Sequence, residues 1–125
     1  MAVLGLGMDV CSVDRVSRVL HGPNGSRFRE RVYTPAEVAI CEGRADAATA
    51  YAARFAAKEA LVKALGAPAG IRWRDMEVVK ADSGAPRFSL TGVAEREVKA
   101  RGARVLLALT HDAGVAAATV VLDAT

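Results

Sequence analysis

Features that mark several classes of protein are scarce in this chain. Its 125 residues include one Trp, two Tyr and three Phe, too few for a platform on which nucleic-acid bases stack. No apolar run reaches the roughly 18 residues that cross a membrane. The opening ten residues, MAVLGLGMDV, lack the basic start and cleavage site of a signal peptide. The sequence therefore predicts a cytoplasmic protein with no nucleic-acid and no membrane partner.

Cysteine is equally scarce. Cys11 and Cys41 are 30 positions apart by their numbers and fit no metal-binding spacing such as CxxC. In a reducing compartment we expect two buried thiols, and we assign them no function.

Hydrophobic residues are abundant, at 52% of the chain, which predicts a single domain over residues 1–125 with a substantial core. The initiator methionine and the absence of linkers or repeats favour a free-standing protein. A net charge of +3 and a pI of about 9.2 favour an anionic partner. The dense basic tracts of nucleic-acid binders are missing, so acidic proteins and phosphorylated small molecules are the candidates.

Hydrophobic periodicity predicts an α+β fold with antiparallel hairpins and one long central helix. Gly22 to Arg31 is expected to be a basic loop, and Thr34, Pro35 and Glu37 to form a capping box that opens a helix. The predicted strands are 3–10, 76–80, 87–90, 105–109 and 115–122. The other predicted helices are 13–21, capped by Ser12, one from about Asp46 to Gly66, and 91–101.

The stretch RFAAKEALVKALG, residues 54–66, has an unusual distribution of charge. At 100° per residue, the charges form two narrow stripes, Arg54 with Lys58 and Glu59 with Lys63. Apolar side chains fill nearly every other direction, so we expect a helix packed on several sides with its charges directed into clefts. The plainer interpretation is an exposed Glu59–Lys63 pair worth about 0.3 kcal/mol, with Arg54 and Lys58 reaching solvent along the apolar surface.

Two carboxylates occupy apolar surroundings: Asp9 at the end of the first strand and Glu59 on the long helix. Buried carboxylates need a partner, and Mg²⁺ takes one or two of them, keeps several waters and completes its shell with substrate phosphates. Asp9 could instead cap the following helix while Glu59 pairs with Lys63. The candidates for binding an anion beside them are Arg54, Lys58, Lys63 and the glycine-containing segment 66–70.

His111 and Asp112 are expected at the tip of the last hairpin, where scaffolds often carry functional groups. A purely structural histidine fits the pattern equally well.

Three segments, GLGMDVCSVDRV, RFAAKEALVKALG and LALTHDAGVAAATVVL, together resemble the holo-acyl-carrier-protein synthases, the small 4'-phosphopantetheinyl transferases. The segment IRWRDMEVVKADSGAPRFSLTG is also similar, so the resemblance covers most of the chain in order. It implies a Mg²⁺ enzyme that moves the phosphopantetheine arm of coenzyme A to a serine hydroxyl of an apo acyl carrier protein. Adenosine 3',5'-bisphosphate is the released product.

The resemblance also implies roles for individual residues. Asp9 and Glu59 match metal ligands, and Lys63 would stabilise charge on the breaking bond. The serine proton would pass to a metal-bound water or a carboxylate, with Asp112 as an alternative base. The matches to coenzyme A contacts are Arg54, Lys58, Lys63, Gly66 and His111, and the matches to the carrier-protein surface are Arg15 and Arg18.

The family usually forms a homotrimer with its active sites at subunit interfaces, so His111 would serve a neighbouring chain. A non-catalytic module that holds coenzyme A or an acidic protein is the alternative function. The paired carboxylates disfavour that alternative, because holding an anionic ligand requires cations rather than carboxylates.

Overall fold

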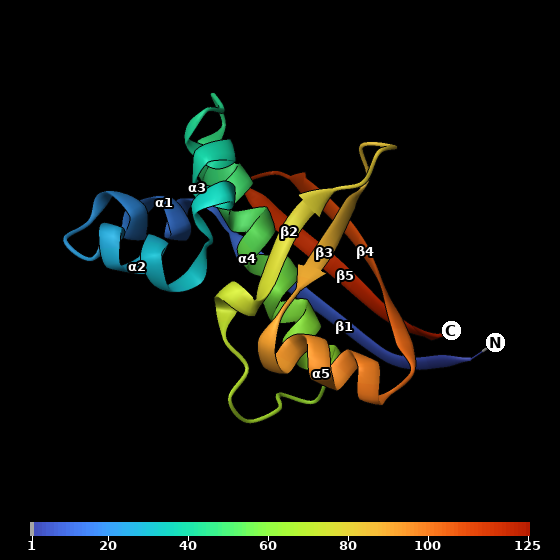
Figure 1. Cartoon of the computed structure of the whole chain (residues 1–125). Coiled ribbons are helices and arrows are strands. Elements are labelled where there is room, and N and C mark those ends of the chain that lie inside the picture. The colour runs from blue at the N-terminus through green and yellow to red at the C-terminus, as the bar shows by residue number, and fades with distance from the viewer. Residues whose placement is uncertain (1) are drawn as a thin grey trace.

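A three-stranded antiparallel sheet and a two-stranded hairpin lie on opposite sides of the longest helix (Figure 1). The computed structural model describes residues 2–125. The elements in chain order are β1 (Val3–Ser12), α1 (Val13–His21), α2 (Gly25–Val32), α3 (Pro35–Glu42), α4 (Ala47–Ala64), the 3₁₀ turn η1 (Trp73–Asp75), β2 (Met76–Lys80), β3 (Pro86–Leu90), α5 (Gly92–Ala100), β4 (Ala103–Asp112) and β5 (Val115–Ala124). The predicted α+β class and long central helix are confirmed.

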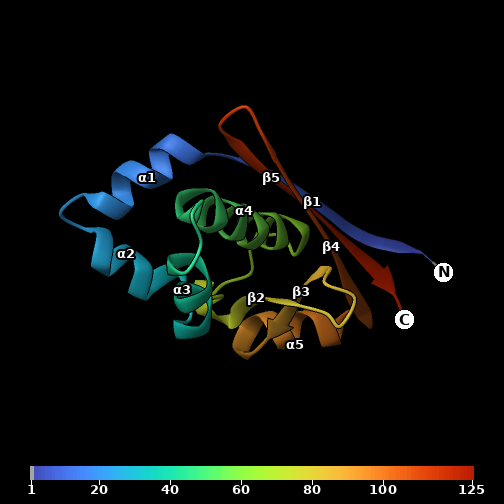
Figure 2. The ribbon, with the colours of Figure 1, turned by 90° about the horizontal axis from the view of Figure 1, so that it is seen from above.

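Helix α4 is the centre of the core. It packs against the sheet of strand order β1-β5-β4, and on its other side lies a second layer formed by α3, β2, β3 and α5 (Figure 2). Ala52, Ala56, Ala57 and Ala60 have no exposed surface, and their small side chains allow neighbouring backbone to come close. The expectation that this helix is packed on several sides is therefore confirmed.

Two glycines of β1 allow the strand to approach α4 closely. A Cβ atom on Gly7 would lie 1.9 Å from the carbonyl oxygen of Ala60, and one on Gly5 would lie 2.8 Å from that of Ala64. Both distances are too short for any side chain, so these positions require glycine. The close approach places the inward-facing side chains of β1 directly beside α4.

Helix ends follow the predicted caps. The Ser12 hydroxyl accepts a hydrogen bond from the Arg15 N–H at 3.2 Å, and the Thr34 and Glu37 capping box opens α3. Gly66, at φ 76°, follows the end of α4 in the left-handed conformation that favours glycine.

The prediction of a basic loop from Gly22 to Arg31 is wrong, because residues 25–32 form α2. Its sequence, GSRFRERV, is polar on most sides and gives a weak helical signal. Phe28 packs edge-on against Tyr33 and also against Phe55, with centroid distances of 5.7 and 6.0 Å. Tertiary packing of Phe28 and of the buried Val32 therefore stabilises a helix that local sequence does not specify.

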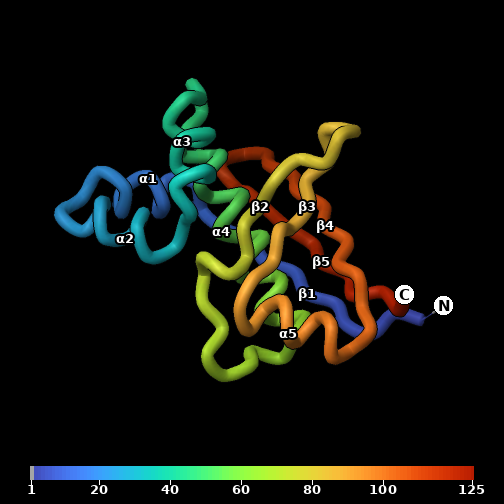
Figure 3. The backbone as a smooth tube through the Cα atoms, in the orientation of Figure 1, coloured from blue at the N-terminus to red at the C-terminus, as the bar shows by residue number. Residues whose placement is uncertain are grey.

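Strands β4 and β5 are longer than predicted and join through the two-residue turn Ala113–Gly114, where both φ angles are positive, 52° and 77°. His111 and Asp112 consequently belong to the end of β4 rather than to a loop. At the opposite end of the sheet, the two chain ends lie side by side (Figure 3), and the Ala124 N–H donates to the Ala2 carbonyl at 2.9 Å.

The outer face of the sheet is apolar. Within residues 2–125 no element covers it, and its exposed large side chains are Leu4, Leu6, Met8 and Val10 of β1 and Leu106 of β4. Leu6 is 65% exposed and Met8 is 60% exposed. A contiguous apolar surface of this kind is typical of a contact with another macromolecule. None of the helices formed by residues 2–125 combines the length and apolarity needed to span a bilayer.

Candidate functional site

The structure brings Asp9, Glu59 and Lys63 together at the β1 edge of the sheet; we call these three residues the carboxylate cluster. Asp9 faces α4 from β1, and its side chain is 17% exposed. Lys63 Nζ lies 3.0 Å from Asp9 Oδ1 and donates to the Met8 carbonyl at 3.1 Å. The side chain of Lys63 therefore connects α4 to β1, and its ion-pair partner lies 54 positions earlier in the sequence.

The electrostatics of the carboxylate cluster favour an additional cation. Burial raises the pKa of Glu59, the negative charge of Asp9 raises it further, and Lys63 offsets part of the effect. Lys63 forms its ion pair with Asp9, so the negative charge of Glu59 is only partly offset, and bringing the two carboxylates together has a free-energy cost.

The donor set fits Mg²⁺. Both side chains offer carboxylate oxygens, and among residues 2–125 no group of three or more His, Cys, Asp or Glu side chains forms a larger metal cage. Magnesium characteristically takes one or two protein carboxylates and leaves the other positions to water and phosphate.

Neither structural explanation of the two carboxylates is correct. Ser12, not Asp9, caps α1, and Lys63 forms its ion pair with Asp9 rather than with Glu59. Neither a helix cap nor an ion pair within α4 therefore explains why Asp9 and Glu59 lie together.

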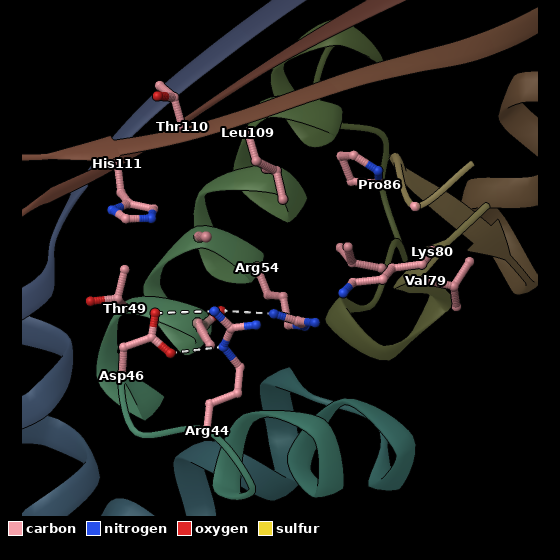
Figure 4. A pocket seen from close by; sticks show the side chains of 14 residues that line it. Arg44, Asp46, Thr49, Arg54, Val79, Lys80, Pro86, Leu109, Thr110 and His111 are labelled. Atoms are coloured by element: carbon pink, nitrogen blue, oxygen red, sulfur yellow. Dashed lines mark hydrogen bonds and ion pairs between the residues drawn. The ribbon is translucent and has the colours of Figure 1, made fainter. Parts of the chain in front are cut away.

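A second group of polar residues lines a cavity of ≈ 210 Å³ between α4, the β2–β3 hairpin and the end of β4 (Figure 4). We call it the cationic pocket. Its polar lining residues are Arg44, Asp46, Thr49, Arg54, Lys80, Thr110 and His111, and apolar walls come from Ala50, Ala53, Val78, Val79, Pro86 and Leu109. Arg54 lies between His111 on one side and Lys80 on the other (Figure 4).

Arg54 is suited to hold an anion in the cationic pocket. Its Nη1 donates to the Ala50 carbonyl at 3.2 Å, whereas its Nε is, in the described part of the chain, the single buried side-chain nitrogen or oxygen without a hydrogen-bond partner. A buried donor without a partner is costly, and a phosphate oxygen would satisfy it. Arg44 is partly neutralised by Asp46, at 2.8 Å, which leaves the pocket with excess positive charge.

Arg54 and His111 of this pocket were predicted from the sequence as ligand contacts, whereas Arg44, Lys80 and Thr110 were not. These residues come from the α3–α4 loop, the end of β2 and the end of β4, respectively. Each is an ordinary polar residue in its own segment, so no local pattern marks it. Only the packing of those segments around α4 brings them together.

The prediction that Lys58 contacts the phosphates of coenzyme A is wrong. Lys58 is fully buried, and its ammonium group donates to the Val32 carbonyl, Glu37 Oε1 and the Trp73 carbonyl. All three donors have protein partners, so Lys58 is neither a phosphate contact nor a side chain that reaches solvent. The helical period correctly placed Lys58 below Arg54, but the packing closes that position to ligand.

The remaining predicted residues lie on the surface. Arg15 and Arg18 are exposed on α1 and line a shallow pocket with Gly22, Pro23 and Asn24. Gly66 is exposed at the end of α4. Asp112 lines a small hollow beside Val13, separate from the carboxylate cluster.

The carboxylate cluster and the cationic pocket occupy opposite edges of the sheet. Lys63 contacts β1, whereas Arg54 shares its pocket with β4, and β5 lies between these two strands. Arg54 and Glu59 are also separated by about 140° around α4 at 100° per residue. One chain therefore presents two separate groups of candidate residues, which we call the two half-sites, rather than one continuous pocket.

Known proteins match this chain over nearly its whole length. The profile of the 4'-phosphopantetheinyl transferase superfamily matches residues 5–119. A holo-[acyl-carrier-protein] synthase of Myxococcus xanthus is 63% identical, over 98% of this chain and 97% of the relative.

Solved structures show the same fold. The holo-[acyl-carrier-protein] synthase of Neisseria meningitidis has a TM-score of 0.84 at 28% identity, covering 98% of this chain and 99% of that one. The Helicobacter pylori enzyme in complex with coenzyme A has a TM-score of 0.79 at 27% identity, covering 94% and 99%. The chain belongs to the 4'-phosphopantetheinyl transferase superfamily and, within it, to the holo-acyl-carrier-protein synthases.

Proposed function

We infer that this protein transfers the 4'-phosphopantetheine arm of coenzyme A to a serine hydroxyl of an apo acyl carrier protein and releases adenosine 3',5'-bisphosphate. The observation that carries the inference is 63% identity with a holo-[acyl-carrier-protein] synthase over nearly the whole chain. The two half-sites would supply what the reaction requires, a place for a divalent cation and a place for phosphate groups. The coenzyme A complex of the Helicobacter pylori relative supports coenzyme A as the substrate.

We propose Mg²⁺ as the metal, held by Asp9 and Glu59. When bound, it would neutralise charge on the pyrophosphate of coenzyme A. Lys63, which now neutralises Asp9, would then be free to turn its ammonium group toward the phosphate oxygens. There it would stabilise the charge that develops as the pyrophosphate bond breaks. Catalysis of phosphoryl-type transfer consists largely of such positioning and charge compensation.

The cationic pocket is the proposed site for the nucleotide end of coenzyme A. Arg54 has a free buried donor, and His111 and Lys80 lie on either side of it. A volume of ≈ 210 Å³ holds only part of such a ligand, since pockets for whole cofactors measure about 300–1,000 Å³. We expect the segment that begins at Gly66 to lie along the remainder of the ligand.

A homotrimer would complete the site. The two half-sites lie at opposite edges of one sheet, so a cyclic assembly that sets the β1 edge of one subunit beside the β4 edge of the next would join them. The uncovered apolar face, which includes Leu6, Met8 and Leu106, supplies a surface for such an assembly.

The carrier protein is proposed to bind at α1. Arg15 and Arg18 are exposed on this helix, which starts directly after β1 and hence close to the carboxylate cluster. Their charge complements an acidic carrier and would steer its approach.

Incubation with coenzyme A, MgCl₂ and apo acyl carrier protein, followed by mass spectrometry of the carrier, tests the proposal. Transfer adds the mass of phosphopantetheine to the carrier, and chelation of the metal should prevent it. The alternative, a module that only holds coenzyme A or an acidic protein, predicts binding of the ligands with no change in carrier mass.

A further inference from the structure

The two fully buried charged side chains of the described residues, Lys58 and Glu37, form an ion pair. Lys58 Nζ lies 2.7 Å from Glu37 Oε1, and both side chains have 0% exposed surface. The pair joins α3 to α4 across 21 positions of sequence.

Each polar side-chain atom of this pair also forms a hydrogen bond with the backbone. Lys58 Nζ also donates to the carbonyl of Val32 at 2.8 Å and to that of Trp73 at 3.1 Å. Glu37 Oε1 accepts from the Thr34 N–H at 3.0 Å, and Oε2 accepts from the Val78 N–H at 3.0 Å. The pair therefore links α4 with the end of α2, the start of α3, η1 and β2.

These links converge on one wall of the cationic pocket. Lys58 lies one helical turn after Arg54 on α4, while Val78 and Lys80 of β2 line the opposite side of the pocket. Strand β2 makes only sparse direct contact with α4. Trp73 and Val78, the two backbone partners of the pair in this region, lie just before β2 and within it.

Stability alone does not explain a pair of this kind. An apolar pair of similar volume often stabilises a core as well as a buried ion pair does, because desolvation offsets the attraction between the charges. What an apolar pair cannot provide is an acceptor for the hydrogen bond that the Val78 N–H of β2 donates to Glu37 Oε2.

We propose that Lys58 and Glu37 are positioning residues for the cationic pocket, holding β2 against α4 so that Lys80 and Arg54 face the same bound phosphate. The inference rests on the proposed function, in which this pocket takes the nucleotide end of coenzyme A. Neither residue touches the ligand, and both act through the placement of β2.

The first test replaces both residues, as Glu37→Met together with Lys58→Met, so that no unpaired charge is left buried. Calorimetry with adenosine 3',5'-bisphosphate and urea unfolding are carried out on the parent protein and the double variant. We expect the variant to fold and its dissociation constant for the nucleotide to rise about tenfold or more. Its KM for the carrier protein should stay within about twofold, because that surface is elsewhere.

The matched control is Val120→Ala, which removes buried volume from β5 without touching β2 or the cationic pocket. In the folded control the dissociation constant should equal that of the parent. A folded double variant that binds the nucleotide as the parent does would overturn the positioning role. Failure of the parent to bind would overturn the pocket assignment and the positioning role with it.

A second measurement needs no variant. If the pair holds β2 in place, the Val78 N–H should exchange with deuterated solvent only through global unfolding, at the rate of the slowest core amides. Exchange through a local opening of β2, at low denaturant and well before the core, would contradict the proposal even if the double variant did not fold.

Discussion

Glu59 occupies a position where its negative charge is unfavourable, because burial and Asp9 both raise its pKa. A side chain kept in such surroundings is a candidate for function, since its ionised form lowers stability unless a cation is bound. Asp9 and Lys63 complete this cluster, whereas Lys58, the neighbour of Glu59 in sequence, points into the core.

Glu59→Gln should abolish transfer and also stabilise the metal-free fold. Loss of a direct metal ligand should lower activity by at least about 100-fold, the upper range for residues that only support a ligand. The raised pKa means that the folded protein binds more protons than the unfolded chain as pH rises from the ordinary glutamate range to the raised value. The parent therefore loses stability over that interval, and the variant does not.

Urea unfolding without metal, at pH values below and above that interval, measures the difference. The variant should exceed the parent in unfolding free energy only at the higher pH. Full activity in the variant would refute the metal assignment, and a destabilised variant would show that Glu59 has a structural partner instead.

Among the elements, β1 and α4 form the pair that builds the carboxylate cluster. Their separation is set by backbone contact at Gly7, where a Cβ atom would lie 1.9 Å from the Ala60 carbonyl oxygen. Asp9 lies two residues further along the same face of β1. The geometry of the carboxylate cluster thus depends on Gly7, which has no functional group of its own.

Gly7→Ala should destabilise the protein by about 1–3 kcal/mol, the usual cost of overpacking, and lower activity in the folded fraction as β1 moves from α4. Gly43→Ala is the matched control, because its nearest neighbour would be 3.4 Å away, an ordinary contact. Urea unfolding of both variants checks the effect. Equal stability of the two would mean that β1 and α4 are less closely held than the structure indicates.

Helix α1 carries the proposed carrier-protein surface, and charge reversal there separates the two substrates. Arg15→Glu should raise the KM for the carrier protein several-fold and weaken its dependence on salt, because a cation that steers an acidic partner is lost. The KM for coenzyme A should change little. Steady-state kinetics at two ionic strengths measure both, and Arg96→Glu on the exposed side of α5 is the control. Equal losses for both substrates would argue against separate surfaces.

Local sequence predicted most elements because their signals are local. Caps at Ser12 and at Thr34 with Glu37 identified the starts of α1 and α3, and the glycine at 66 identified the end of α4. Helix α2 was missed for the opposite reason. It is held by the packing of Phe28 against Phe55 of α4, 27 positions later in the sequence, and by the burial of Val32 in the core, and no window of neighbouring residues contains these contacts.

At the scale of the whole molecule, the structure separates the proposed functional residues into two half-sites. If a subunit interface joins them, two inactive variants should complement each other. In a mixed trimer of Glu59→Gln and Arg54→Met subunits, one of the three interfaces has both halves intact. After random exchange of equal amounts, homotrimers included, this amounts to about one quarter of all interfaces.

Activity after subunit exchange should therefore rise to about one quarter of the parent value, although each variant alone is nearly inactive. Native mass spectrometry establishes that mixed trimers have formed. Mixed trimers without recovered activity would show that each active site lies within one chain.

The sequence by itself determined Asp9 and Glu59 as the candidate metal ligands, the α+β class and the family, because these depend on residue types at fixed positions along the chain. The tertiary structure decided which charges stay at the surface of the molecule and which face the core. Lys58 and Lys63 lie on the same helix, yet Lys58 is fully buried in an ion pair with Glu37, whereas the partly exposed Lys63 pairs with Asp9 of β1. The burial and partners of a long charged side chain depend on segments far away in sequence, and only the packed chain brings them into contact.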